Sequence, residues 1–171
     1  VMDTRAEELI RSRLLAARAD DGILGEEGAD HRGTSDITWV VDPIDGTVNY
    51  LYEFPVYSVS VAAVIGDPAT TGQWQPVAGA ICNPLAPEVF HARLGGGAYC
   101  LAGEDDREIK ANTVDVLVQS LVATGFGYRH EVRARQGQII AALLPEVRDI
   151  RRPGSAALDL CTVACGRVDA Y

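Results

Sequence analysis

The sequence has no surplus of positive charge and no block of lysine or arginine. Its 171 residues include 15 lysines and arginines against 24 aspartates and glutamates, which gives a formal net charge of −9. Binding to a nucleic-acid backbone or an anionic membrane normally uses clustered basic residues. The composition therefore predicts that neither nucleic acid nor membrane is the main partner.

Long hydrophobic runs and closely spaced cysteine pairs are also absent. No apolar segment approaches the roughly 20 residues that a membrane-spanning helix needs. The four cysteines include no Cys-x-x-Cys pair, so a zinc site is not supported. We interpret Cys82, Cys100, Cys161 and Cys165 as reduced thiols, which predicts a cytoplasmic protein.

Length and composition predict one globular domain. Hydrophobic residues make up 47% of the chain and charged residues 23%, which is ordinary for such a domain. A helical pattern begins at Asp3, and the chain stops within an apparent strand at Arg167–Tyr171. We therefore expect a single domain over 1–171 that is truncated at both ends.

Helical and strand patterns alternate irregularly, which predicts a mixed α/β fold built in layers. Periodicity predicts helices over about 3–18 and 129–144, and a third helix from Ser155, its N-cap, to about Cys165. The first helix is expected to bury Leu9, Ile10, Leu14 and Leu15. Strands are predicted at 23–24, 37–41, 56–65, 77–82, 88–92, 99–100, 121–124 and 147–151.

The segment Asp42-Pro43-Ile44-Asp45 follows an apolar strand and carries most of the functional information. Proline has no backbone N–H, so we expect the strand to end and the chain to turn at Pro43. That turn can bring Asp42 and Asp45 to one side and leave the Ile44 carbonyl free as a ligand. With Glu26 upstream, three carboxylates can converge, and converging carboxylates normally need cations between them.

The next residues extend this site toward a phosphate. Gly46 permits close backbone approach, and the segment Asp45-Gly46-Thr47 can begin a helix whose N–H groups face an anion. The Thr47 hydroxyl can orient a nucleophilic water. We therefore predict Mg²⁺ and attack of a metal-bound water on a phosphate ester. A capped surface turn would explain Asp-Gly-Thr alone, but the longer string with Gly-Glu-Glu is far more specific.

Two other carboxylate motifs differ from this one in their spacing. An EF-hand loop needs acids at alternate positions and a later glutamate. Haloacid-dehalogenase phosphatases carry Asp-x-Asp-Gly-Thr and use the first aspartate as a covalent nucleophile. Here two residues separate Asp42 from Asp45, which argues against an aspartyl-phosphate intermediate.

Together these segments resemble the inositol monophosphatase family. That family carries G-E-E, then W-[IV]-[IV]-D-P-[IL]-D-G-T-x-N-[FY], then R-x-x-G-S-A-A-x-[DN]-[LM], which here is Arg151–Leu160. The resemblance covers essentially the whole chain from Asp3. It implies an alternating αβαβα layered sandwich, frequent homodimers, and Mg²⁺-dependent, lithium-sensitive hydrolysis of phosphate monoesters.

The resemblance also implies roles for individual residues. Glu26, Asp42 and the Ile44 carbonyl would hold the first Mg²⁺, while Asp42 and Asp45 would hold the second, in a site with two or three ions. Glu26 and Thr47 would position the attacking water. The implied substrate contacts are Ile44, Asp45, Gly46, Thr47, Gly154, Ser155 and Ala156. The family's further ligand to the second metal would lie beyond Tyr171.

The expected partner is a small phosphorylated polyol or sugar. Inositol 1-phosphate is the leading substrate, and relatives with this site also hydrolyse histidinol phosphate, fructose 1,6-bisphosphate or 3′-phosphoadenosine 5′-phosphate. An alternative of another class is a non-catalytic regulator that binds the transcription machinery, as some bacterial relatives do. The histidines His31, His91 and His130 do not cluster with the acids, and we interpret them as solvated or satisfied side chains.

Overall fold

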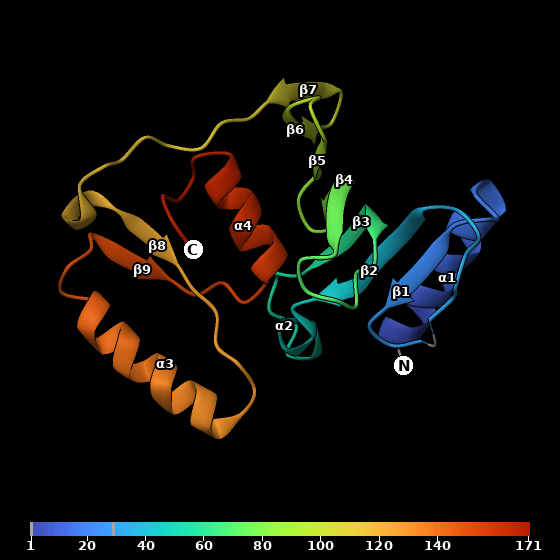
Figure 1. Ribbon diagram of the computed structural model, residues 1–171. Coiled ribbons are helices and arrows are strands. Elements are labelled where there is room, and N and C mark those ends of the chain that lie inside the picture. The colour runs from blue at the N-terminus through green and yellow to red at the C-terminus, as the bar shows by residue number, and fades with distance from the viewer. Residues whose placement is uncertain (1, 29) are drawn as a thin grey trace. The chain divides into compact units, whose positions relative to one another are not determined.

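The computed structural model describes residues 2–28 and 30–171, and the chain divides into two compact units (Figure 1). Unit 1 comprises Val1–Glu108, and unit 2 comprises Ile109–Tyr171. Within the described ranges, no helix is both long and apolar enough to cross a membrane.

Unit 1 is a sheet of seven strands that lie side by side in chain order. Strands β1 and β2 are parallel, and every later pair is antiparallel. The elements of this unit are α1 (Met2–Ala17), β1 (Gly22–Gly25), β2 (Ile37–Asp45), α2 (Thr47–Leu51), β3 (Ser58–Gly66), β4 (Trp74–Asn83), β5 (Glu88–Arg93), β6 (Ala98–Ala102) and β7 (Asp105–Glu108).

Apolar strand residues form the core of unit 1, which explains why the sequence pattern located most of its strands. Ile23, Val41, Val64, Phe90 and Cys100 are all buried. Strand β7 was not predicted, because all of its residues are exposed and its sequence has no apolar alternation. Among the described residues its one partner strand is β6, and it gains its strand conformation from that pairing.

Helix α1 forms where the periodicity predicts it, but the predicted apolar face is partly wrong. Leu9 is 59% exposed, whereas Glu7 is 1% exposed and is the buried residue of the helix. A glutamate is buried at such a position only when hydrogen bonds or charges compensate it. Those partners belong to the candidate site described below.

Strand β2 continues through Pro43, so the expected end of the strand before this residue is wrong. The register shifts between Asp42, which lies opposite Ser60, and Asp45, which lies opposite Ser58. Strand β2 therefore carries one residue more than β3 over this stretch, which is a β-bulge. A bulge accommodates proline because the regular hydrogen-bond ladder is interrupted there, so no backbone N–H is needed from that residue.

Unit 2 contains a parallel pair of strands and two α-helices. Its elements are the short 3₁₀ helix η1 (Leu117–Gln119), β8 (Leu121–Ala123), α3 (His130–Leu143), β9 (Asp149–Arg151) and α4 (Ala156–Ala164). Val122, Val147, Leu158, Cys161 and Val168 are buried in this unit. The expected strand near the end of the chain takes the form of a single bridge between Val122 and Ala170.

Candidate functional site

The β-bulge at the end of β2 positions two acidic side chains. Pro43 and Ile44 are buried, so the apolar residues of the bulge are anchored in the core. Asp42 is half-buried, and its Oδ1 accepts a hydrogen bond from the Ile44 N–H at 3.2 Å. The hydroxyl of Ser58 donates to Oδ2 of Asp45 at 3.5 Å. The bulge therefore holds both aspartates at one strand end.

Glu26 joins these aspartates because β1 and β2 are parallel. The register pairs Gly25 with Val41, so the next residues, Glu26 and Asp42, emerge side by side. The two carboxyl groups share a hydrogen bond. Two segments that lie apart in the sequence thus bring three acidic side chains to the same edge of the sheet.

The environment of Asp42 strongly disfavours its charged form. Burial, followed by the negative charges of Glu26 and Asp45 and the hydrogen bond with Glu26, raises the pKa of Asp42 to about 7. The hydrogen bond from the Ile44 N–H acts in the opposite direction but is the weakest cause. Asp42 therefore exchanges its proton near neutral pH, where its protonated and ionised forms coexist, and nearby positive charge would favour the ionised form.

The donor set suits a hard divalent cation. In the part of the chain that the structure describes, no group of three or more His, Cys, Asp and Glu side chains is arranged so that it could hold a metal ion. Glu26 and Asp45 instead each interact with Asp42. Carboxylate and carbonyl oxygens are the preferred ligands of Mg²⁺, and a dication would relieve the repulsion that raises the pKa of Asp42.

Gly46 and Thr47 follow the bulge and begin α2. Gly46 has φ 96°, a left-handed conformation that favours glycine, and it occupies the N-cap position of the helix. The Thr47 hydroxyl donates to the Ile44 carbonyl at 3.0 Å. The expectation that this carbonyl is free of hydrogen bonds is therefore wrong. A carbonyl oxygen has a second lone pair, which keeps it available as a ligand.

The residues predicted to line the substrate side lie in unit 2. Gly154 has φ 105° and precedes Ser155, the N-cap of α4. The Ser155 hydroxyl is fully buried and accepts the Leu158 N–H at 3.3 Å, which confirms the predicted cap. Ala156 is the first residue of the helix. A substrate role for these three residues stays a prediction.

Glu7 is a residue of this region that sequence reasoning missed. Its carboxylate accepts hydrogen bonds from the backbone N–H groups of Glu27 at 2.8 Å and Gly28 at 2.9 Å. A single glutamate in a helix carries no recognisable signal. The glycines on either side of Glu26-Glu27 are the only hint that something packs closely against this loop.

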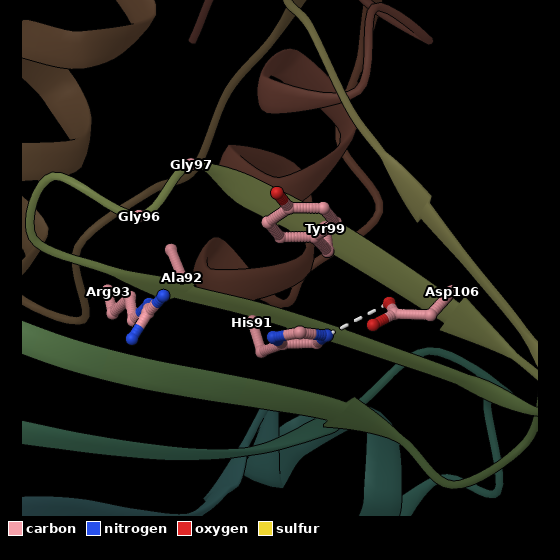
Figure 2. Close-up of a pocket in the computed structure, with 7 residues that line it drawn as sticks. All are labelled: His91, Ala92, Arg93, Gly96, Gly97, Tyr99 and Asp106. Carbon is pink, nitrogen blue, oxygen red and sulfur yellow. Dashed lines mark hydrogen bonds and ion pairs between the residues drawn. The ribbon is translucent and has the colours of Figure 1, made fainter.

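A second polar cluster lies on strands β5 to β7. The His91 ring is 3.0 Å from Oδ1 of Asp106 and stacks on the Tyr99 ring, with 5.6 Å between ring centroids. These side chains and Arg93 line a cavity of about 240 Å³. Figure 2 shows how they lie around it. His91 is a satisfied side chain, as the sequence analysis predicts.

Comparison with known proteins gives consistent matches over the whole chain. The model of the inositol monophosphatase family matches residues 1–171. Inositol-1-monophosphatase SuhB of Mycobacterium tuberculosis is 47% identical over 176 residues, which are 100% of this chain and 58% of that protein. Nus factor SuhB of Xylella fastidiosa is 44% identical over 171 residues, with coverage of 99% and 58%.

Solved structures share the fold. Mycobacterium tuberculosis SuhB matches with a TM-score of 0.87 and 44% identity over 99% of this chain and 64% of that one. Inositol monophosphatase from Anabaena matches with a TM-score of 0.86 and 33% identity, over 98% and 63% of the two chains. These likenesses confirm the predicted mixed α/β layered fold class. The chain spans about three fifths of the length of these relatives.

Proposed function

Because the chain belongs to the inositol monophosphatase family, we propose that its protein is a Mg²⁺-dependent phosphatase of small phosphate monoesters. The observation that carries this proposal is the carboxylate cluster of Glu26, Asp42 and Asp45, whose mutual repulsion a dication would relieve. Inositol 1-phosphate is the leading substrate, since several relatives are named inositol-1-monophosphatase. Its hydrolysis would give myo-inositol and phosphate.

In this proposal Glu26, Asp42 and the Ile44 carbonyl hold one Mg²⁺, and Asp42 and Asp45 hold a second, in a site with two or three ions. Bound Mg²⁺ supplies positive charge that lowers the pKa of water and offsets the charge that develops on the phosphate. Asp42 would hold the cations in its ionised form, so it would have to release its proton when they bind.

Thr47 orients the attacking water together with Glu26. The threonine hydroxyl has one proton, which it donates to the Ile44 carbonyl. Its oxygen can therefore only accept a hydrogen bond from a water, so one O–H of that water points at Thr47. The carboxylate of Glu26 accepts a hydrogen bond from the other O–H of the water. A lone pair of the water oxygen is then left to face phosphorus.

Backbone N–H groups of Gly46 and Thr47 bind the phosphate in this proposal. Helix α2 has five residues, so local N–H groups rather than a long helix dipole would act on the anion. Ile44 and Asp45 are further proposed substrate contacts in unit 1, and Gly154, Ser155 and Ala156 are the substrate contacts proposed for unit 2. We propose a homodimer in the cytoplasm, where the four free thiols would stay reduced.

The proposal is tested by phosphate release from the full-length protein, with and without Mg²⁺. The substrates are inositol 1-phosphate, histidinol phosphate, fructose 1,6-bisphosphate and 3′-phosphoadenosine 5′-phosphate. We expect Mg²⁺-dependent release that is fastest with inositol 1-phosphate. A preference for another monoester would overturn the substrate, and the lack of release from all of them would overturn the phosphatase assignment.

The chemical course of the reaction is a separate prediction. We expect direct attack by water with inversion at phosphorus, because Asp42 and Asp45 are metal ligands in this proposal rather than nucleophiles. Hydrolysis of a phosphate ester made chiral with oxygen isotopes measures the stereochemistry. Retention of configuration, or labelled phosphate trapped on either aspartate after rapid quenching, would contradict direct attack.

A second candidate function is that of a regulator that acts on the transcription machinery. One relative at 44% identity is named a Nus factor. Affinity purification of the full-length protein from its own cells, with an Asp42→Asn variant beside it, separates the two functions. A regulator that acts through protein contacts would capture transcription proteins equally well with either form.

A further inference from the structure

We infer that Glu7 is a positioning residue that holds the loop Gly25–Gly28 and thereby sets the affinity of the carboxylate site for Mg²⁺. This inference rests on the function proposed above. The carboxylate of Glu7 accepts the N–H groups of Glu27 at 2.8 Å and of Gly28 at 2.9 Å. Helix α1 therefore binds the loop directly after Glu26 through both oxygens of one side chain.

The glycines of this loop fit the same contact. A Cβ atom at Gly25 would lie 2.2 Å from Oε1 of Glu7, and one at Gly28 would lie 2.5 Å from the same oxygen. The loop backbone thus packs against the carboxylate on both sides of Glu26-Glu27. This close packing explains why glycine occurs at both positions.

The charge of Glu7 is compensated within the protein. Glu7 is 1% exposed, so solvent cannot stabilise its carboxylate. The two backbone N–H groups do so, and the guanidinium of Arg11 lies 3.8 Å from Oε1. A buried group with all of these partners has one orientation, and the loop that it binds is fixed with it.

Glu26 benefits from this support because its own side chain is exposed, so burial in the core does not fix it. The N–H of Glu27 belongs to the peptide group that begins at the carbonyl of Glu26. Fixing that peptide fixes the direction in which the Glu26 side chain leaves the backbone. That direction leads to Asp42, with which Glu26 shares a hydrogen bond.

The test compares Glu7→Gln with Glu8→Gln in the full-length protein. Glutamine has the same shape but one acceptor oxygen, so its NH₂ group would face a backbone N–H. Glu8 is an exposed neighbour on the same helix and serves as the control. We measure the Mg²⁺ concentration for half-maximal hydrolysis, kcat and KM at saturating Mg²⁺, and the Mg²⁺-dependent rise in Tm without substrate.

We expect Glu7→Gln to need about 10- to 100-fold more Mg²⁺, as is typical when a residue that orients a metal ligand is lost. Saturating Mg²⁺ should restore most of kcat, and KM should change little. Glu8→Gln should behave as the unmodified protein. A role confined to folding would instead lower Tm and leave the Mg²⁺ dependence unchanged, which would overturn the inference.

Amide hydrogen exchange in the unmodified protein provides a measurement that does not depend on the variant folding. The N–H groups of Glu27 and Gly28 should exchange slowly although their residues are exposed, and fast exchange would overturn the contact. If the unmodified protein shows neither hydrolysis nor a Tm response to Mg²⁺, the proposed function fails. If it responds and Glu7→Gln responds identically, the inference alone fails.

Discussion

The negative charge of Asp42 lowers the stability of the metal-free protein, whereas the same charge would attract a cation. Its pKa is raised to about 7 from an ordinary value of 3.8, so the folded state holds a proton more tightly than the unfolded state does. Above pH 4 the stability of the metal-free protein therefore falls as pH rises, until Asp42 is ionised in both states. The repulsion that destabilises the metal-free protein is the same property that would favour the binding of a dication.

We predict that Asp42→Asn stabilises the metal-free protein near pH 8 and abolishes Mg²⁺-dependent hydrolysis. Removing the charge should raise Tm by roughly 2–4 °C, which corresponds to about 1 kcal/mol for a chain of this size. The Tm of the variant should no longer rise with Mg²⁺. Thermal melts with and without Mg²⁺ measure both effects, and Asp36→Asn, at an exposed position, is the control. Near-normal turnover of Asp42→Asn at saturating Mg²⁺ would rule out the two-metal site.

Asp21 shows the reverse case, a buried carboxylate that the fold keeps charged. The hydrogen bond from Arg18 lowers the pKa of Asp21 to about 2; hydrogen bonds from Ser35 and Trp39 act in the same direction, and burial opposes them. We predict that the stability from these contacts is complete above pH 4 and is lost as pH falls toward 2. Denaturant titrations across this range measure the loss. The Asp21→Asn variant should be less stable at pH 6, with a flatter acid dependence.

At the scale of elements, the apolar strands were predictable because their pattern follows burial. Helices α1 and α3 were predictable from their 3.6-residue periodicity, although neither has a buried apolar residue. The cap at Ser155 was predictable because a short polar side chain before an apolar helix has one common local use. Strand β7 and the β-bulge were not, because both depend on pairing with a neighbouring strand. The acidic site was visible in sequence, yet the contact from Glu7 joins residues 20 and 21 positions apart and leaves no local pattern.

The junction between β2 and α2 leads to a prediction with a matched control. Gly46 has φ 96° and Gly72 has φ 78°, so alanine is strained at both positions. The strain should cost about 1–2 kcal/mol of folding free energy in each variant. Only Gly46→Ala should also lower kcat, because it moves the N–H groups proposed to bind the phosphate. Gly72 lies in a loop with open space around it and reports the strain alone. Equal kcat values for the two variants would exclude a phosphate contact at Gly46.

At the scale of the whole molecule, the proposed metal ligands and the substrate contacts proposed from the segment Arg151–Leu160 belong to different units. Unit 1 contains Glu26, Asp42 and Asp45, whereas Gly154, Ser155 and Ala156 belong to unit 2. Each unit has its own buried apolar residues. Substitutions in the carboxylate cluster are therefore expected to change Mg²⁺ dependence, and substitutions in unit 2 to change KM and the preference among monoesters.

Lithium tests how the complete protein builds its second metal position. In this proposal Asp42 and Asp45 hold that ion, and Li⁺ would take its place after phosphate transfer, with phosphate still bound. Inhibition of the full-length protein should therefore be uncompetitive with respect to substrate, so kcat and KM should fall by the same factor. Initial rates over a matrix of substrate and Li⁺ concentrations at fixed Mg²⁺ measure the pattern of inhibition.

Two variants provide the control for this prediction. Asp45→Asn should weaken the inhibition by Li⁺, whereas Asp36→Asn should leave it unchanged. Purely competitive inhibition would show that Li⁺ binds before the substrate, and no inhibition at high Li⁺ would show that it does not enter this position. Either result would contradict a second ion position that Asp42 and Asp45 form as proposed.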